Sequence, residues 1–298
     1  RPAPPAGGLP GVSAADLAVR RCNVSRAAPP RRKGKCKPLA YPLADFFDFV
    51  QNWDFFTGFI GLGTAYFIHL VSSAQCSLGV TGAIGEIGVA GGKSFAAMAF
   101  TRRGDEPLVA CDLFSMGLEK DNVPDANLPL FREVLRACRL PEDDVIILKQ
   151  SSLQLRDSDL VGLAAVQRVA AGRRAAAQRV GRFRLFHVDG GHFALAALHD
   201  LNSAACALTP GGVVLVDDLH NMGYPGVQEG FHRYMLEDPP VRQLVPFLYT
   251  GRLFLTTPGY AAAYRAAILR AHRRLRSATL YGTEVLQAPP HLFAVAAG

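Results

Sequence analysis

The stretch that decides the fold is a glycine-rich turn between an apolar run and a helix start. It reads Ala83-Ile84-Gly85-Glu86-Ile87-Gly88-Val89-Ala90-Gly91-Gly92-Lys93-Ser94. Glycine has no Cβ, so the backbone of such a turn can press against a ligand, and the amides of the new helix point toward it. A second acid, Asp112, closes the next apolar run. Acids at the ends of two neighbouring strands beside such a turn suit a nucleoside, because the second acid can accept from ribose hydroxyls.

Apolar runs and helical segments alternate after this turn. Continuous apolar strands separated by helices predict an α/β fold with a mostly parallel sheet that is covered on both faces. Near the end, two short runs are joined by Thr250-Gly251, which predicts an antiparallel terminal pair. We expect strands at 83–88, 108–113, 145–149, 183–188, 212–216, 244–249 and 252–256, and helices at 93–101, 128–138, 159–178, 193–208, 227–235 and 260–276.

The basic charge of the chain is concentrated at its start. The net charge is +7, but residues 1–38 hold nine Lys and Arg and one Asp, so the remaining 260 residues carry −1. A Pro- and Arg-rich segment of this kind cannot bury enough apolar surface to order itself, and we expect a disordered tail over 1–38. The balanced charge of the rest argues against nucleic-acid binding by the folded part.

The residues between this tail and the turn are unusually apolar. Residues 55–85 contain no Lys, Arg, Asp or Glu, which is long enough to raise a membrane span. Polar residues and glycines interrupt the stretch, so we favour a buried helix over 63–77. Phenylalanines at near-helical spacing before it predict a small helical cap. The expected organisation is a tail at 1–38, a cap or lid at 39–80, the ligand-binding domain at 81–258, and a C-terminal helix and tail at 259–298.

The six cysteines show no CxxC spacing of the kind that binds metal. Cys22 and Cys36 can pair if the compartment is oxidising, which the sequence leaves open, with the cytoplasm slightly favoured over a secretory or organellar lumen. The others lie in apolar or helical contexts and are expected to be small core residues. They are Cys76, Cys111, Cys138 and Cys206.

The spacing of the glycines separates two kinds of nucleoside cofactor. A dinucleotide fingerprint reads G-x-G-x-x-G, and Gly85, Gly88, Gly91 and Gly92 do not fit it. Glu86 lies inside the turn, where it would repel a pyrophosphate. An acid there suits a cationic cofactor, and S-adenosylmethionine has both a sulfonium and an α-amino group.

At these residues the chain resembles the class I S-adenosylmethionine-dependent methyltransferases. Their first motif is similar to residues 86–94, with Ala90 where a middle glycine is usual. The resemblance covers roughly residues 60–258 and implies a Rossmann-like, mostly parallel seven-stranded sheet. It also implies that Asp112 binds the ribose hydroxyls and that Ser151 or Ser152 lies near the adenine. The full set of implied cofactor-binding residues is Glu86, Gly88, Gly91, Ser94, Asp112, Ser151, Ser152 and Asp189.

A second group of acids follows two later strands. Asp189 ends one strand, and Asp217 and Asp218 end its expected neighbour. Three converging carboxylates repel one another, a conflict that a bound divalent cation removes, and oxygen ligands favour Mg²⁺. His192 lies three residues past Asp189, and because imidazole titrates near neutrality it can take a hydroxyl proton. His187 lies inside an apolar strand and is expected to be a core histidine.

This pattern, Asp-Gly-x-His with a later Leu-x-Pro-Gly-Gly and Asp-Asp, resembles the metal-dependent sugar and macrolide O-methyltransferases and the related cephalosporin-hydroxylase group. The resemblance implies that Asp189, Asp217 and Asp218 hold Mg²⁺ or another divalent cation and that His192 is the general base. The predicted function is S-adenosylmethionine-dependent methylation of a hydroxyl on a small molecule or glycan. A homo-oligomer is compatible with the sequence.

Three other functions stay open. An enzyme of the same fold with a hydroxylase-like reaction could hold Fe(II) at the carboxylates, although two histidines and one carboxylate are more usual for oxygen chemistry. A non-catalytic module could have kept the nucleoside pocket alone. An RNA-modifying enzyme could use the basic tail.

Overall fold

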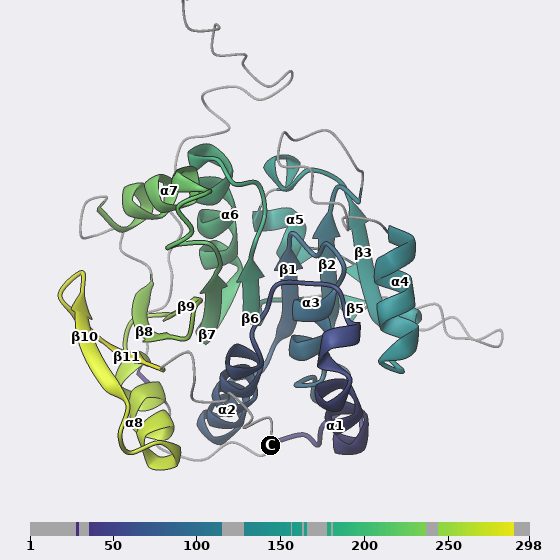
Figure 1. Cartoon of the computed structure of the whole chain (residues 1–298), viewed down its shortest axis with the longest axis horizontal. Coiled ribbons are helices and arrows are strands. Elements are labelled where there is room, and N and C mark those ends of the chain that lie inside the picture. Colours follow the sequence, from purple (N-terminus) through teal and green to yellow (C-terminus); the bar gives the residue numbers. More distant parts are fainter. Residues whose placement is uncertain are drawn as a thin grey trace, which may run out of the picture.

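A nine-stranded sheet forms the centre of the molecule, in the order β10-β11-β8-β9-β7-β6-β1-β2-β3 (Figure 1). The computed structural model describes residues 28–29, 36–114, 128–155, 157–162, 164–165, 178–179, 181–236 and 244–288. The strands of this sheet are β1 (Ala83–Ile87), β2 (Leu108–Asp112), β3 (Val145–Lys149), β6 (Phe183–Val188), β7 (Leu208–Val216), β8 (Val245–Tyr249), β9 (Leu253–Thr256), β10 (Arg276–Leu280) and β11 (Thr283–Gln287).

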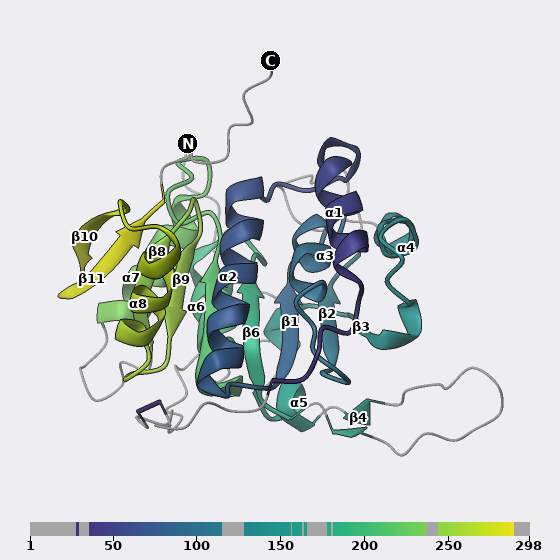
Figure 2. The same ribbon diagram turned by 90° about the horizontal axis from the view of Figure 1, so that it is seen from below.

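Helices cover both faces of the sheet, as predicted. One face carries α1 (Leu43–Gln51), α2 (Leu62–Leu78), α3 (Lys93–Ala99), α4 (Leu128–Ala137) and α8 (Ala261–Ala271), and the other carries α5 (Asp157–Gly162), α6 (Ala194–Ala207) and α7 (Pro225–Leu236). Figure 2 shows α1, α2 and α3 on one side of the strands and α5 on the other. Three short 3-10 helices complete the described elements: η1 (Trp53–Phe55), η2 (Glu142–Asp144) and η3 (Ser152–Gln154).

The central strands are apolar because both of their faces are buried. β1 pairs in parallel with β2 and β6, and β6 pairs in parallel with β7. Successive side chains of a strand point to opposite faces, so Ile84 packs in the core under α2 and α3, whereas Ala83 and Ile87 pack in the core under α6. By the same alternation Glu86 lies on the α3 side.

The antiparallel terminal pair is confirmed, since β8 pairs with β9 and β9 with β7. The sheet is two strands wider than predicted, and the helix expected over 260–276 ends at Ala271. The next residues form the hairpin β10–β11, and β11 lies parallel to β8. Gly282, with φ of +73°, makes the turn of this hairpin, a left-handed conformation that glycine adopts without strain.

The long helix expected over 159–178 is wrong. Helix α5 ends at Gly162, and Ala164–Ala165 (β4) pairs antiparallel with Gln178–Arg179 (β5). Glycine disfavours helix continuation, and α5 ends at this residue. Residues 163 and 166–177 lie outside the described part of the chain.

A disulfide bond joins Cys36 to Cys76, whose Cα atoms are 5.3 Å apart. Cys206 is disulfide-bonded as well. Cys36 therefore does not pair with Cys22, the pairing considered for an oxidising compartment, and Cys76 and Cys206, both expected to be small core residues, form disulfide bonds. Sequence spacing carries no measure of the Cα distance that decides pairing. Cys111 and Cys138 are free and buried, as predicted.

The apolar stretch 55–85 forms α2 and β1 within the globule. No helix in the described ranges is long and apolar enough to cross a bilayer. Of the tail expected over 1–38, only residues 28–29 and 36–38 are described, so that prediction falls outside the described residues.

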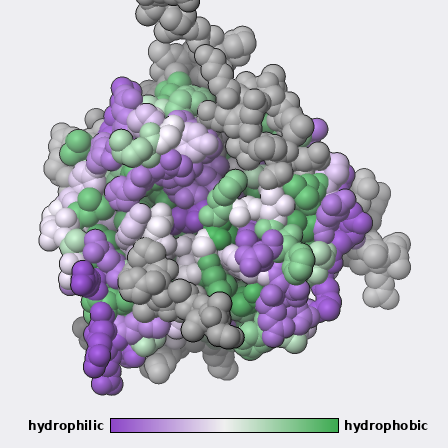
Figure 3. All heavy atoms as spheres, viewed as in Figure 1, coloured by the Kyte–Doolittle hydropathy of each residue, from purple (hydrophilic) through white to green (hydrophobic). Residues whose placement is uncertain are grey.

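The segment between α1 and α2 exposes aromatic side chains while its backbone contacts the sheet edge. Phe55 and Phe59 are 85% and 81% exposed. On the face drawn in Figure 3, hydrophobic residues occur in separate small groups among hydrophilic ones. A Cβ built on Gly91 would lie 2.7 Å from the carbonyl oxygen of Thr57, so this segment presses on the glycine-rich turn.

Candidate active site

The carboxyl ends of β1, β2, β6 and β7 meet at one edge of the sheet, toward the top in Figure 1. Backbone hydrogen bonds tie the turns that leave these strands. The amide of Gly88 donates to Cys111, that of Asp189 to Ile87, and that of Asp217 to Val188. Ligands of open α/β sheets bind beyond this edge, which makes it the place to look for a site.

The glycine-rich turn is built around close backbone contacts. Gly88 has φ of +82°, and a Cβ on it would lie 1.6 Å from the carbonyl oxygen of Asp189. Gly88 thus lets the turn after β1 touch the turn after β6. Gly92 has φ of +92° and begins α3. The predicted glycine positions therefore have a structural reason that is independent of any ligand.

Three residues other than glycine adopt left-handed backbone at this edge. They are Ala90 at φ +46°, Phe114 at φ +45° and Asp218 at φ +54°, after β1, β2 and β7 respectively. Such conformations cost about 1–3 kcal/mol each and persist where the surroundings enforce them, most often at functional sites. Ala90 occupies the position where the family motif usually has glycine.

Asp112 ties the first two turns together. Its Oδ2 accepts from the amide of Ala90 at 2.9 Å, and its Oδ1 accepts from the amide of Phe114 at 2.7 Å. The side chain remains half-buried. Each carboxylate oxygen has a second lone pair, so Asp112 can still accept from a ribose.

Glu86 is fully buried beneath the turn and is held by two donors. Ser94 Oγ donates to Oε1 at 2.5 Å, and Nδ1 of His187 lies 2.6 Å from the same oxygen. Oε2 has no hydrogen-bond partner among the described residues. Burial raises the pKa of Glu86, an effect that Ser94 and Arg252 oppose. A cationic group at Oε2 would stabilise the carboxylate, so an ammonium group of a cofactor fits this atom.

The buried histidine is neutral, and its tautomer is fixed by its neighbours. The guanidinium Nε of Arg252 donates to His187 Nε2 at 3.2 Å, so the ring proton must be on Nδ1, which donates to Glu86. Burial, followed by the charge of Arg252, lowers the pKa of His187 to about 3. His187 is buried as predicted, but it bonds two ionisable residues instead of only filling the core.

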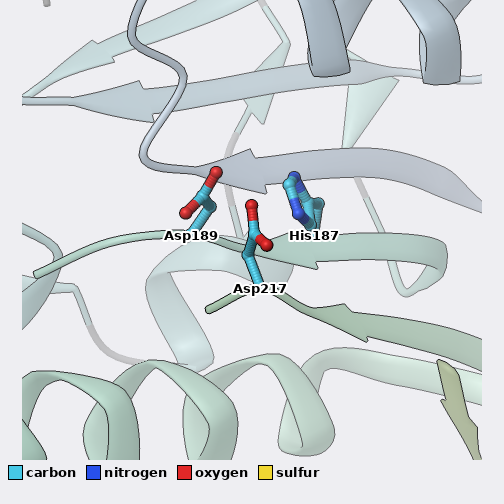
Figure 4. Close-up of side chains that lie close together, drawn as sticks. All are labelled: His187, Asp189 and Asp217. Atoms are coloured by element: carbon cyan, nitrogen blue, oxygen red, sulfur yellow. The ribbon is translucent and has the colours of Figure 1, made fainter. Parts of the chain in front are cut away.

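The carboxylates that follow β6 and β7 form two overlapping groups. In the first, ligand atoms of His187, Asp189 and Asp217 lie within 4.8 Å of one another (Figure 4). In the second, those of Asp189, His192 and Asp218 do. Burial, and then the neighbouring Asp217, raise the pKa of Asp189. The three acids of the predicted metal site therefore gather at this edge, with Asp217 in the first group, Asp218 in the second and Asp189 in both.

His192 lies between a carboxylate and an aromatic ring. Its Nε2 is 3.2 Å from Asp218 Oδ2, and its ring stacks on Tyr224 at 3.9 Å with an interplanar angle of 13°. Burial alone would raise the pKa of Asp218, but hydrogen bonds from His192 and Asn221 outweigh it and lower the pKa. Asp218 and Tyr224 hold the imidazole at the mouth of α6.

The two serines after β3 differ in their surroundings. Ser152 Oγ donates to Asp200 Oδ2 at 2.9 Å, and Asp200 is fully buried on α6. Ser151 is half-buried and precedes the short helix η3. The hydrogen bond therefore anchors the loop after β3 to α6, beside the turn where the cofactor's adenine is expected.

Sequence reasoning missed two residues of the site. Arg252 lies in the β8–β9 turn and reaches the carboxyl ends of β6 and β7, where it forms an ion pair with Asp217. Tyr224 precedes α7 and stacks on His192. Neither belongs to a motif. Arg252 was detectable only from the expected hairpin, because the antiparallel pair β7–β9 brings its turn to the end of β7.

The fold and the arrangement of the strand ends are similar to those of methyltransferases. Residues 86–219 match a family model described as "Methyltransferase domain". The sheet order and the antiparallel pair agree with that class.

Solved structures share the fold at low identity. The O-methyltransferase NovP matches at 15% identity with a TM-score of 0.50, covering 66% of this chain and 81% of NovP. CalS11, a TDP-rhamnose 3'-O-methyltransferase, matches at 16% identity, TM-score 0.47 and coverage of 70% and 86%. An O-methyltransferase from Bacillus cereus matches at 12%, TM-score 0.43 and coverage of 74% and 92%. No curated protein sequence matches the chain.

Proposed function

We propose that this protein is an O-methyltransferase that transfers the methyl group of S-adenosylmethionine to a hydroxyl of a small molecule or sugar, assisted by a divalent cation. The observation that carries the proposal is the arrangement at one sheet edge. A buried carboxylate with an unpartnered oxygen, on Glu86, lies under the glycine-rich turn, and a histidine with two carboxylates lies beside it. The match to a methyltransferase domain supports the same chemistry.

The cofactor side is formed by the ends of β1 and β2. Glu86 would hold the α-amino group through Oε2, and Asp112 would accept from the ribose hydroxyls. Bound S-adenosylmethionine supplies an electrophilic methyl group on a sulfonium. Because Glu86 is buried and Asp112 is fixed by two backbone amides, both carboxylates are oriented before binding.

The acceptor side is formed by the turns after β6 and β7. Asp189 and Asp218, with Asp217 as a third candidate, would hold a divalent cation, which would lower the pKa of an acceptor hydroxyl. An acceptor with two adjacent oxygens, such as a sugar diol or a catechol, suits this arrangement best. The acids supply hard oxygen ligands, which Mg²⁺ prefers.

His192 would accept the hydroxyl proton. With Nε2–H directed to Asp218, the lone pair of the imidazole is on Nδ1, and the positive charge that forms is balanced by Asp218. The acceptor oxygen would bond to the methyl carbon as the bond from that carbon to sulfur broke, and S-adenosylhomocysteine would be released. Tyr224 limits rotation of the ring during this step.

Calorimetry with S-adenosylmethionine tests the cofactor assignment. We expect the wild-type protein to bind it, and Glu86→Gln to bind at least ~10-fold more weakly, because a hydrogen bond to a charged group contributes roughly 1.5–3 kcal/mol. Ser77→Ala is the matched control, since that hydroxyl bonds only within α2, to Ser73. Wild-type binding weaker than about 1 mM would exclude this function.

Product formation tests the reaction. Release of S-adenosylhomocysteine is measured against a panel of catechols and sugar diols, with Mg²⁺ and with a chelator. Turnover that persists in chelator and in Asp189→Ala would remove the cation from the mechanism. Cofactor binding with no turnover on any acceptor would favour a binding module.

A further inference from the structure

Arg252 is a buried cation in the middle of the acidic site. It is 5% exposed and lies at the start of β9, where it donates through all three guanidinium nitrogens. Nε donates to His187 Nε2 at 3.2 Å, Nη1 donates to the carbonyl oxygen of Phe59 at 3.4 Å, and Nη2 forms an ion pair with Asp217 Oδ2.

This position follows from the register of the sheet. Val216 of β7 faces Leu253 of β9 in the antiparallel ladder, so the next residues, Asp217 and Arg252, are neighbours across the two strands. Opposite charges in such a pair stabilise each other. A guanidinium stays charged under all ordinary conditions, and a buried charge requires a partner. Asp217 is the carboxylate that meets this requirement.

The contacts of Arg252 prevent a metal ion from binding to one of the two sets of candidate ligands. In the group of His187, Asp189 and Asp217, both imidazole nitrogens are engaged, Nε2 by Arg252 and Nδ1 by Glu86. Asp217 carries the ion pair. A cation that entered this group would have to displace the guanidinium and would meet its positive charge.

In the described part of the chain, Asp189 and Asp218 of the other group form no hydrogen bond or ion pair with the guanidinium, although its charge favours their carboxylate forms. The members of this group are Asp189, His192 and Asp218, and Asp218 is bonded to His192 and Asn221. Asp189 belongs to both groups. A divalent ion therefore meets two sets of candidate ligands. One is hydrogen-bonded to the Arg252 guanidinium through His187 and Asp217, and the other has Asp218 in their place.

We propose that Arg252 is the resident cation of the acidic site, and that it holds Asp217 and His187 so that a divalent ion binds to Asp189 and Asp218, beside the base His192. Arg252 is thus a positioning residue that selects the metal ligands. This inference rests on the proposed function for the presence of an ion. It departs from the simplest interpretation of the sequence, in which Asp217 and Asp218 are equivalent ligands.

The experiment measures Mn²⁺ affinity by calorimetry, without cofactor or acceptor. In Arg252→Gln we expect Mn²⁺ to bind at least tenfold more tightly than in the wild type, because Asp217 becomes available and a positive charge is lost. Adding Asp217→Asn to that variant should remove the gain, and Arg252→Lys should stay within about threefold of the wild type, since it keeps the charge. Arg182→Gln is the control, since that arginine bonds carbonyl groups at the opposite end of the sheet. Unchanged or weaker Mn²⁺ binding in folded Arg252→Gln would overturn the proposal.

A second comparison holds even if Arg252→Gln does not fold. In the otherwise wild-type protein, Asp218→Asn should weaken Mn²⁺ binding at least ten times more than Asp217→Asn, whereas equal losses would overturn the proposal. If the wild type binds no Mn²⁺ but Arg252→Gln does, both metal assistance and the selection of ligands by Arg252 are refuted, because the guanidinium then excludes the ion altogether. If neither protein binds Mn²⁺, Arg252 is not a competitor of a metal ion.

Discussion

Replacing Cys36 and Cys76 by serine removes a constraint on the unfolded chain. Their disulfide spans a sequence separation of 40 and encloses α1, η1 and most of α2. The chain-entropy relation, with an entropy loss of about 2.1 + 1.5R ln n cal/mol/K for a loop of n residues, gives ~4 kcal/mol at 25 °C for this separation. We expect the double variant to lose about that much free energy of unfolding, which is a large part of the roughly 5–15 kcal/mol of a native protein.

Urea unfolding measures the loss. The chain has one tryptophan, Trp53, which lies inside the enclosed loop with the Lys93 ammonium over its ring at 4.4 Å. Its fluorescence reports on the loop, and circular dichroism reports on the whole fold. The same titration of the double variant under reducing conditions separates the effect of the disulfide at Cys206. A loss below ~1 kcal/mol would refute the loop-entropy reasoning, and ready alkylation of Cys36 in the unreduced native protein would refute the pairing.

The same loop connects stability to the site. It includes Thr57, whose carbonyl oxygen meets Gly91, and Phe59, whose carbonyl oxygen accepts from Arg252. We therefore expect the double variant to bind S-adenosylmethionine more weakly than a variant of equal stability altered elsewhere. Disulfides persist in oxidising compartments, so the bond is expected to form on expression in a secretory lumen and not in a reducing cytosol.

Three further predictions concern titratable groups. His192→Ala should lower the methyl-transfer rate by ~10²–10⁴-fold at neutral pH while sparing cofactor affinity, as measured by turnover and calorimetry, because a general base contributes that much; an unchanged pH–rate profile would contradict the role. Burial lowers the pKa of His69 to about 4. The unfolded ring takes up its proton near pH 6.5, so the free energy of unfolding should fall by up to ~3 kcal/mol between pH 6.5 and pH 4, and fall less in His69→Gln, in urea titrations at several pH values. Burial lowers the pKa of Lys93, so Lys93→Met should be tolerated, with a change within about 1 kcal/mol in the same assay.

The central sheet could be predicted because its strands are buried on both faces. Residues 145–149 and 183–188 are mainly apolar, the second interrupted by Arg184 and His187, and the structure gives the strands these same limits. The run after Asp159 contained no such signal. Alanine and arginine favour a helix in isolation, but a helix in a protein needs an apolar stripe for packing, and α5 ends at Gly162.

Some functional residues could be predicted from the sequence and others could not. Acids such as Asp112 and Asp189 could be found because a parallel sheet places strand ends at one edge, and an acid there has no role in the core. The disulfide partner of Cys36 could not be found, because pairing depends on distances between segments far apart in sequence. The hairpin after Ala271 was missed because four of the five residues of β10 are exposed and give no apolar pattern.

The hydrogen bonds around Glu86 depend on the register of the strands, which could not be predicted from the sequence. Glu86 of β1 is the direct lateral partner of His187 on β6, and Val216 on β7 is the partner of Leu253 on β9, one residue from the ion pair of Asp217 and Arg252. Both contacts are cross-strand neighbours and belong to no motif. Shifting either pair of strands by one residue would turn these side chains to the other face. The chemistry of Glu86 was legible from its place in the turn, but its connection to Asp217 exists only in the register in which four strands align.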